Sequence, residues 1–234
     1  MKLYNNSSTF PHPWSTITTA NFQKYPNPIS THVLSVDILS RHIDPKTGFL
    51  HTERLLVCRQ PAPALLRRLL PIPDEAIFRE ISIVDPKTQT YTATSWNLTM
   101  RSIIEVEETC VFRPHPDNRW NETVFEQTAK FTAGGWSNLA KMVEDNAVNA
   151  FQNNAGKGRK GLELVIDQVI REAKEVEERL TQGLKEVEEG ITKSFEEVEE
   201  RFTQGLKEVE EGIKQGLAGA GVAAEGNPSS GWKS

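Results

Sequence analysis

The side chains with suitable chemistry for catalysis are few and lie far apart in the sequence. The five histidines are His12, His32, His42, His51 and His115. They form no metal-spaced pair, and no nucleophile elbow, phosphate-binding loop or dinucleotide fingerprint occurs in the chain. The two cysteines, Cys58 and Cys110, are too few for a disulfide framework or a four-ligand zinc site. We therefore expect a protein that is not an enzyme and uses neither a metal nor a cofactor.

Charge is distributed unevenly along the chain. The formal net charge is −5, but residues 173–234 contain 8 Lys/Arg and 14 Glu, which leaves 19 basic and 18 acidic residues before them. A nearly neutral globular part lacks the basic surface typical of nucleic-acid binding. No stretch is apolar enough to span a membrane, and the first 23 residues fit neither a secretory signal nor an arginine-rich transit peptide. We expect no nucleic-acid partner, no membrane span and no cleaved presequence.

Short β-type segments separated by turn residues predict an antiparallel sheet up to about residue 131. The expected strands are residues 32–40, 49–58, 77–84, 91–98, 103–112 and 123–131. In the first of them Leu34, Val36 and Ile38 alternate with polar residues, so we expect this strand to be buried on one face. Asp-Pro-Lys-Thr, a turn sequence, follows at residues 44–47 and recurs at 85–88.

Two helices are predicted to interrupt and close this sheet. The first runs from Trp14 to Lys24, after two prolines and before Pro26. The second follows two glycines and carries apolar residues at helical spacing from Trp136 to Ile170. We expect this long helix to lie against the sheet.

The proline-flanked segment 60–73 is too short for an ordinary core helix, so we expect a loop with one apolar turn. Its central residues are Leu65, Leu66, Arg67, Arg68, Leu69 and Leu70. Two interpretations remain open at this point. Either the leucines form a satellite core under a loop, or the segment is a lid whose leucines enter lipid while its arginines meet phosphate.

An eleven-residue unit repeats four times between Lys174 and Leu217. Its apolar residues recur at steps of 4, 4 and 3, so an apolar stripe runs almost straight along one side of a predicted helix. The glutamate-rich opposite face argues against a membrane-surface helix, which leaves pairing with another helix or folding back on the domain. We expect a domain at 1–172, a repeat helix at 173–217 and a disordered tail at 218–234.

Short motifs occur in a fixed order over about the first 170 residues. They are Met1-Lys2-Leu3, Phe10-Pro11-His12-Pro13-Trp14, Lys24-Tyr25-Pro26-Asn27-Pro28, the segment 32–41, Thr52-Glu53-Arg54-Leu55, Val84-Asp85, Asn97-Leu98-Thr99-Met100 and Pro114-His115-Pro116. Together they resemble the PRELI family of mitochondrial lipid-transfer proteins, specifically its Slowmo-like branch. The resemblance implies an α+β fold in which a curved antiparallel sheet and helices enclose a lipid-binding tunnel, followed here by a long C-terminal helical extension.

The resemblance also implies where the protein works and with what. The expected location is the mitochondrial intermembrane space, with transient peripheral contact with mitochondrial membranes. The expected partner is a small helical twin-cysteine-motif protein that forms a heterodimer with the domain. The expected ligand is a phospholipid.

The resemblance further implies where the lipid head group binds. Carried over to this sequence, the basic position before Tyr-Pro-Asn-Pro is Lys24, the strand histidine is His32 and the strand arginine is Arg54. The long helix adds Asn154 and Lys157. Without the resemblance, Lys24 would be a solvated lysine at a helix end, and His32 a satisfied strand histidine.

The function expected from the resemblance is transfer of phosphatidylserine between the outer and inner mitochondrial membranes. Some relatives carry a basic residue where this chain has Ala150, which weakens the case for phosphatidic acid, the alternative lipid. A hypothesis from a different class is an interaction scaffold that acts through the acidic repeat helix.

Overall fold

The computed structural model describes residues 1–59, 62–135 and 138–222. Contacts within the chain divide it into two compact units, Met1–Ala173 and Lys174–Ser234. The first unit contains the whole sheet and about the first ten turns of the longest helix.

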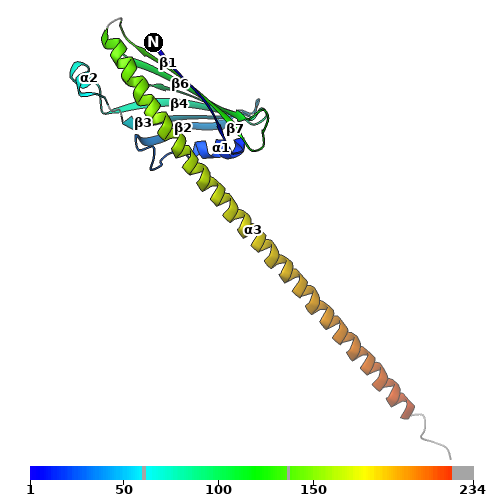
Figure 1. Ribbon diagram of the computed structural model, residues 1–234. Helices are drawn as coiled ribbons and strands as arrows, with labels where there is room; N and C mark the ends of the chain where they lie inside the picture. Colours follow the sequence, from blue (N-terminus) through cyan, green and yellow to red (C-terminus); the bar gives the residue numbers. More distant parts are fainter. Residues whose placement is uncertain (60–61, 136–137, 223–234) are drawn as a thin grey trace, which may run out of the picture. The chain divides into compact units, whose positions relative to one another are not determined.

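The first unit is built on one seven-stranded antiparallel sheet (Figure 1). Its strands are β1 (Lys2–Phe10), β2 (Val33–Ile43), β3 (Leu50–Arg59), β4 (Glu75–Asp85), β5 (Thr90–Asn97), β6 (Ile104–Pro114) and β7 (Thr123–Ala133). Strands β2 to β7 form a meander, and β1 pairs with β7 to give the order β1-β7-β6-β5-β4-β3-β2. The predicted α+β class with a curved antiparallel sheet is confirmed.

Strand β2 corrects one prediction, because it is not buried on one face. Leu34 is 39% exposed and Ile38 is 55% exposed. The strand lies at the end of the sheet order, and its pairing with β3 shifts register between Val33 and Ser35 and again between Ile38 and Ser40. Each shift interrupts the two-residue alternation on which the prediction depended.

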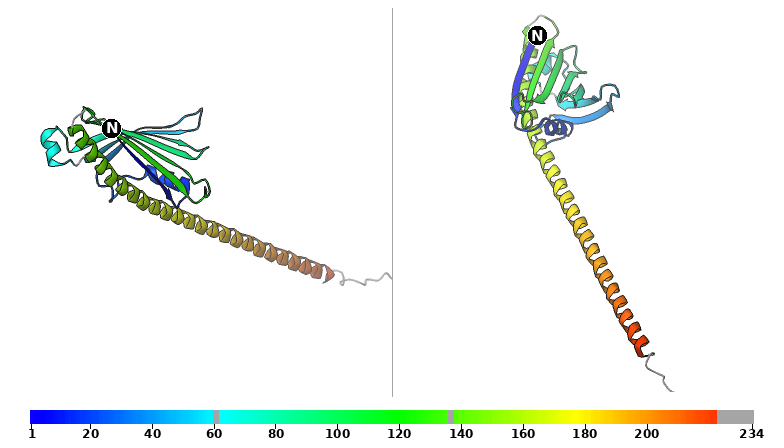
Figure 2. Two further views of the ribbon diagram at one scale, coloured as in Figure 1. Left: turned by 45° about the horizontal axis from the view of Figure 1, so that its top comes forward. Right: turned by 90° about the vertical axis from the view of Figure 1, so that its right-hand side faces the viewer.

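Helices close the sheet on one side. Helix α1 (Trp14–Phe22) ends two residues before the predicted Lys24, and helix α3 (Asn138–Val222) begins close to the predicted start. The predicted first residue of that helix, Trp136, lies outside the described residues. Figure 2 shows the first part of α3 running along the curved sheet. One core cluster joins Phe10, Ile17, Tyr91 and Ile166, which come from β1, α1, β5 and α3.

The leucine-rich segment forms a short helix, α2 (Ala64–Leu69), where a loop with one apolar turn was predicted. Leu66 is 2% exposed and belongs to a second core cluster with Phe131 and Val143, against which Leu70 packs. Leu65 and Leu69 instead are exposed. The leucines are therefore divided between a satellite core and an exposed apolar surface, and the role of the segment as a lid stays a prediction.

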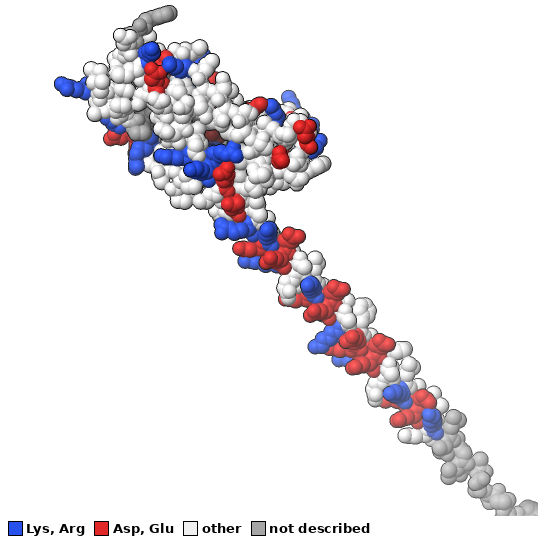
Figure 3. All heavy atoms as spheres, in the orientation of Figure 1, with Lys and Arg blue, Asp and Glu red and all other residues white. Residues whose placement is uncertain are grey.

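The second unit is described as the continuing helix α3, up to Val222. The apolar residues of the repeat are exposed along it: Val176, Leu180, Leu184, Val187, Ile191, Phe195, Val198, Phe202, Leu206, Val209 and Ile213. Figure 3 shows acidic and basic side chains interleaved along this stretch. The helix continues five residues past the predicted end at Leu217, and from residue 223 on the predicted tail lies outside the described residues. No helix in the described part of the chain is both long and apolar enough to cross a membrane.

Candidate functional site

A cavity of about 220 Å³ lies in the first unit, between the sheet and α3. Its apolar wall includes Phe10, Leu56, Phe78, Phe112, Phe151 and Leu162. Charged side chains also reach it from β3, β4, β6 and the connection between α1 and β2. Ala150 of α3 lies on the wall as well, so this position contributes no charge. The cavity thus combines an apolar lining with a small number of charged groups, as small-molecule sites commonly do.

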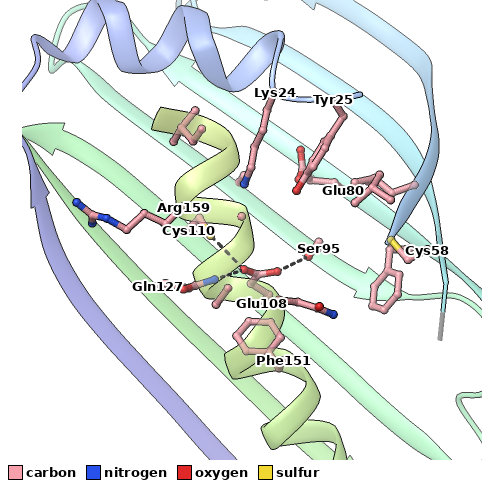
Figure 4. Close-up of a pocket in the computed structure, with 18 of the residues that line it drawn as sticks. Lys24, Tyr25, Cys58, Glu80, Ser95, Glu108, Cys110, Gln127, Phe151 and Arg159 are labelled. Atoms are coloured by element: carbon pink, nitrogen blue, oxygen red, sulfur yellow. Dashed lines mark hydrogen bonds between the residues drawn. The ribbon is translucent and has the colours of Figure 1, made fainter. Parts of the chain in front are cut away.

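Lys24 is held at the cavity by the short segment that follows α1. The Asn27 side chain fixes that segment, because its Oδ1 accepts hydrogen bonds from the backbone N–H of Ile29 (3.0 Å) and Ser30 (2.7 Å). Its Nδ2 donates to the Lys24 carbonyl at 2.7 Å. With its backbone anchored in this way, Lys24 extends its ammonium group toward the cavity (Figure 4).

Several neighbouring groups act on the pKa of the Lys24 ammonium group. Burial alone lowers this pKa, but Tyr25, Cys110 and Glu108 act in the opposite direction, and the net shift is upward. Burial raises the pKa values of the Tyr25 hydroxyl and the Cys110 thiol, so both groups are neutral near neutral pH. Glu108 is the carboxylate among the groups that raise the pKa of Lys24.

Arg54 reaches the cavity but already has a carboxylate partner. It lies directly opposite Glu80 in the β3–β4 register, and its Nε donates to Glu80 Oε1 at 2.7 Å. Arg54 is only 6% exposed. Burial tends to lower its pKa, whereas Glu80 raises it, and the net shift is upward. A phosphate would meet a charge that is already compensated, although the guanidinium has N–H groups besides Nε.

The remaining predicted head-group residues occupy different positions around the site. His32 and Asn154 line the cavity, whereas Lys157 is exposed and lies outside the lining. Burial, followed by the charges of Lys157 and Lys24, lowers the pKa of His32, so the ring is neutral near neutral pH. Its Nδ1 is buried and has no hydrogen-bond partner among the described residues. The structure thus brings four of the five together at the cavity and places Lys157 beside it.

The predicted lid arginines do not face the cavity. Arg67 donates to Asp74 Oδ1 at 2.6 Å, and Arg68 is exposed on the same helix. Neither is among the residues that line the cavity. Their proposed contact with phosphate stays a prediction.

Glu108 is a lining residue that the sequence reasoning missed. It lies on β6 and accepts hydrogen bonds from Gln127 Nε2 (2.6 Å), Cys110 Sγ (3.3 Å) and Ser95 Oγ (3.4 Å), as Figure 4 shows. The alternation along β6 could have indicated that Glu108 faces inward, because every second residue from Val106 to Phe112 lines the cavity: Val106, Glu108, Cys110 and Phe112. A glutamate at an inward-facing position of an otherwise apolar series marks a special environment.

Arg159 is a second lining residue that was not predicted, and its contacts give it a structural role. Its guanidinium donates to Ser8 Oγ (2.5 Å), the Thr9 carbonyl (3.0 Å) and Glu163 (3.0 Å), and it lies 4.2 Å from the Phe10 ring centroid. The contacts with Ser8, Thr9 and Phe10 hold α3 against β1. Arg159 therefore shapes the wall of the cavity.

Comparison with known proteins places this chain in a family. The family model described as the PRELI-like family matches residues 15–173. The chain belongs to the PRELI-like family. It is 41% identical over 167 residues to "Protein UPS2, mitochondrial" of Saccharomyces cerevisiae, covering 71% of this chain and 73% of that protein. It is 40% identical over 173 residues to "Protein slowmo homolog" of Dictyostelium discoideum, covering 74% and 73%.

Among solved structures, a protein from Thermus thermophilus matches with a TM-score of 0.48 and 14% identity, covering 70% of this chain and 97% of that one.

The match to the PRELI-like family model contains every predicted head-group residue, from Lys24 to Lys157, and also Glu108. The site described above thus belongs to the PRELI-like part of the chain. The repeat after residue 173 lies outside the match.

Proposed function

We propose that this PRELI-like protein transfers phosphatidylserine between the outer and inner mitochondrial membranes, across the intermembrane space. The observation that carries the proposal is the cavity between sheet and α3, which combines an apolar wall with the ammonium group of Lys24. Membership of the PRELI-like family supports the coarser part of the proposal, a mitochondrial lipid-transfer role, and the name "Protein UPS2, mitochondrial" supports a mitochondrial location.

Such a cavity addresses the physical obstacle to lipid exchange. Moving two acyl chains of roughly thirty methylene groups through water costs on the order of 25 kcal/mol, at about 0.8 kcal/mol per methylene. An apolar wall replaces the contacts that the chains lose when they leave the bilayer. The anionic phosphate must then be compensated by charge-assisted hydrogen bonds, because an unpaired buried charge is costly. Lys24 supplies such a donor at the wall of the cavity.

The cavity must widen to admit a whole lipid. Its volume of about 220 Å³ is below the roughly 300–1,000 Å³ of typical small-molecule pockets. The space is therefore sufficient for a head group but not for two acyl chains. We propose that outward movement of α2, whose Leu65 and Leu69 are exposed, opens a path for the chains toward the membrane.

The proposal includes a protein partner. The partner is a small helical protein with twin cysteine motifs that forms a heterodimer with the PRELI-like domain. Co-expression with and without such a partner, followed by size-exclusion chromatography and pull-down, tests the complex. Recovery of only the free domain at micromolar concentrations of both proteins contradicts it.

A liposome assay tests the transfer activity itself. Donor liposomes contain labelled phosphatidylserine, phosphatidic acid or phosphatidylcholine, and the lipids of separated acceptor liposomes are identified by mass spectrometry. We expect unchanged phosphatidylserine in the acceptor at a rate well above that without protein. A chemically altered lipid would instead indicate an enzyme, and equal rates with and without protein would refute transfer. Faster transfer of phosphatidic acid than phosphatidylserine would retain the mechanism and replace the ligand.

The exposed apolar stripe of the repeat favours one further candidate function, an interaction scaffold. Truncation after Glu172 distinguishes the two, because it removes the repeat and retains nearly all of the PRELI-like match. We expect the truncated protein to transfer lipid at close to the full rate. Loss of transfer, with the fold retained, would make the repeat part of the activity.

A further inference from the structure

The charges around the cavity can be sorted by their partners. Arg54 is paired with Glu80 at 2.7 Å, and Arg159 is paired with Glu163 at 3.0 Å. Glu108 forms no ion pair among the described residues, although its charge acts on the Lys24 ammonium group. Arg59 also lines the cavity, but it is exposed at the end of β3. Lys24 and Glu108 are more buried, and they face the same cavity without a closed ion pair between them (Figure 4).

A carboxylate in this position requires an explanation, because it stands in an otherwise apolar series on β6. Its neighbours in the alternation, Val106 and Phe112, contribute apolar surface to the cavity. Placing a charge there costs free energy that an apolar residue would not incur. The three side chains that donate to Glu108 come from β5, β6 and β7, and all of them are neutral.

The donors fix the carboxylate but do not neutralise it. A carboxylate offers about four lone-pair sites to donors. The Gln127 amide and the Cys110 thiol both donate to Oε1, whereas Oε2 receives only the long 3.4 Å hydrogen bond from Ser95. Oε2 thus retains capacity for a stronger donor. Glu108 also raises the pKa values of Cys58 and Cys110, after the larger effect of burial.

We propose that Glu108 accepts the ammonium group of an amino-phospholipid head group, while Lys24 binds the phosphate of the same molecule. This inference rests on the proposed lipid transfer and adds a residue that determines specificity. The phosphate of such a head group meets Lys24, and its ammonium group meets Glu108. Phosphatidic acid offers a phosphate to Lys24 but no ammonium group to Glu108, so the charge of the carboxylate would stay unpaired. Glu108 therefore favours head groups that carry an ammonium group over those that lack one.

Glu108→Gln is the variant that tests the inference, because it removes the charge and retains an amide oxygen that can accept the hydrogen bond from Gln127. The matched control is Glu107→Gln, which makes the same change on the adjacent residue of β6, where the side chain is exposed and outside the lining. The full chain, in complex with its partner if one is required for stability, is assayed with donor liposomes containing phosphatidylserine or phosphatidic acid at the same surface charge density.

A charge-assisted hydrogen bond of the usual strength corresponds to a discrimination of about 10-fold or more. In the wild-type protein we expect phosphatidylserine to move faster than phosphatidic acid by a ratio that Glu108→Gln reduces by about 10-fold. The Glu107→Gln control should retain the wild-type ratio. A purely structural role of Glu108 would instead lower both rates in parallel, and this outcome or an unchanged ratio overturns the inference.

A second measurement needs no mutation and covers the case in which Glu108→Gln does not fold. N-Acetyl-phosphatidylserine retains the phosphate, the carboxylate and the acyl chains but lacks the ammonium group. We expect the wild-type protein to transfer it at least about 10-fold more slowly than phosphatidylserine. Equal rates for the two lipids would overturn the role of Glu108 and leave lipid transfer intact. Absence of transfer of any lipid would refute the proposed function itself, and the inference with it.

Discussion

Gly161 of α3 lies so close to Asn27 that a Cβ atom at position 161 would stand 2.8 Å from Asn27 Nδ2 and 2.9 Å from Oδ1. The same atom would stand 2.9 Å from Ser30 Oγ. Asn27 is the residue whose amide fixes the segment behind Lys24. The absence of a side chain on Gly161 therefore allows the helix to approach the segment that positions the cavity's ammonium group.

Gly161→Ala should destabilise the protein even though alanine is the better helix former. The added methyl group displaces the Asn27 side chain and disturbs the hydrogen bonds that Asn27 makes, at a cost of about 1–3 kcal/mol for overpacking. The control is Gly156→Ala on the same helix, where a Cβ atom would meet nothing within 4 Å. That change should raise the free energy of unfolding by up to about 1 kcal/mol. Denaturant unfolding measures both, and equal shifts for the two variants would contradict the contact.

Breaking the buried ion pair Arg54–Glu80 should lower the free energy of unfolding strongly, whereas replacing both residues by apolar ones should lower it little. Their side chains are 8% and 14% exposed, so Arg54→Met leaves a mostly buried carboxylate unpaired and should cost about 3–5 kcal/mol. The double variant Arg54→Met/Glu80→Met should recover most of this loss. The control pair is Arg113–Glu126, with side chains 48% and 40% exposed, where loss of one partner should cost no more than about 1 kcal/mol. Additive effects of the Arg54 and Glu80 substitutions would show that the pair is not coupled.

The two kinds of leucine in α2 should respond differently to truncation. Leu66→Ala removes a side chain that is 2% exposed and should cost about 2–5 kcal/mol of stability. Leu65→Ala changes a side chain that is 56% exposed and should leave the unfolding free energy within about 0.5 kcal/mol of wild type. If α2 opens toward the membrane, Leu65→Ala should nevertheless slow lipid transfer from liposomes. Lipid transfer at the wild-type rate by this variant would show that Leu65 has no role in the path of the lipid.

Periodicity predicted the meander and the long helix because each depends on a local pattern of side chains. The exposure of β2 could not be predicted in the same way, because Leu34 and Ile38 alternate as a buried strand would. Their exposure follows from the position of β2 at the end of the sheet and from two register shifts, which are properties of pairing. The same limit applies to Glu108. Gln127 and Ser95 meet it only because β5, β6 and β7 pair in one particular register.

The resemblance to a family supplied the cavity residues that no local pattern indicates. Lys24, His32 and Arg54 lie on three different segments, yet all line one cavity. Neither the local pattern of side chains nor the family resemblance predicted the pairing of Arg54 with Glu80. The two residues are 26 positions apart in sequence, and they meet because β3 and β4 pair in a particular register.

His32 should make the stability of the ligand-free protein fall as the pH decreases. Burial first, and then Lys157 and Lys24, lower its pKa from the ordinary value of 6.5. The unfolded chain therefore takes up a proton below about pH 6.5 while the folded protein does not, so stability decreases with a slope of at most about 1.4 kcal/mol per pH unit. The loss ends once the pH is below the folded-state pKa. His32→Asn should remove this contribution, and Lys157→Gln should diminish it.

Denaturant unfolding between about pH 7.5 and about pH 5 measures the effect of His32. This window is separate from that of Asp44 and Asp85, whose lowered pKa values place their contribution below about pH 4. The same pH slope in His32→Asn as in wild type would show that another group titrates there. Binding of an anionic lipid near His32 should oppose the slope, because a negative charge favours the protonated ring.

Cys58 should be slow to react with thiol reagents as long as the cavity is intact. Burial, followed by the charge of Glu108, raises its pKa from 9.0 to about 11. At pH 8 the thiolate population is then about 100-fold smaller than that of an unperturbed thiol, and the thiolate is the reacting form. A Cys110→Ser variant isolates Cys58, and alkylation is followed by mass spectrometry in buffer and in denaturant. Denaturant should restore the ordinary rate. Lipid bound in the cavity should slow the reaction further, since Cys58 is a lining residue. If Cys58 were alkylated as fast in buffer as in denaturant, the cavity would be open to solvent at Cys58 and would not protect a bound lipid from water.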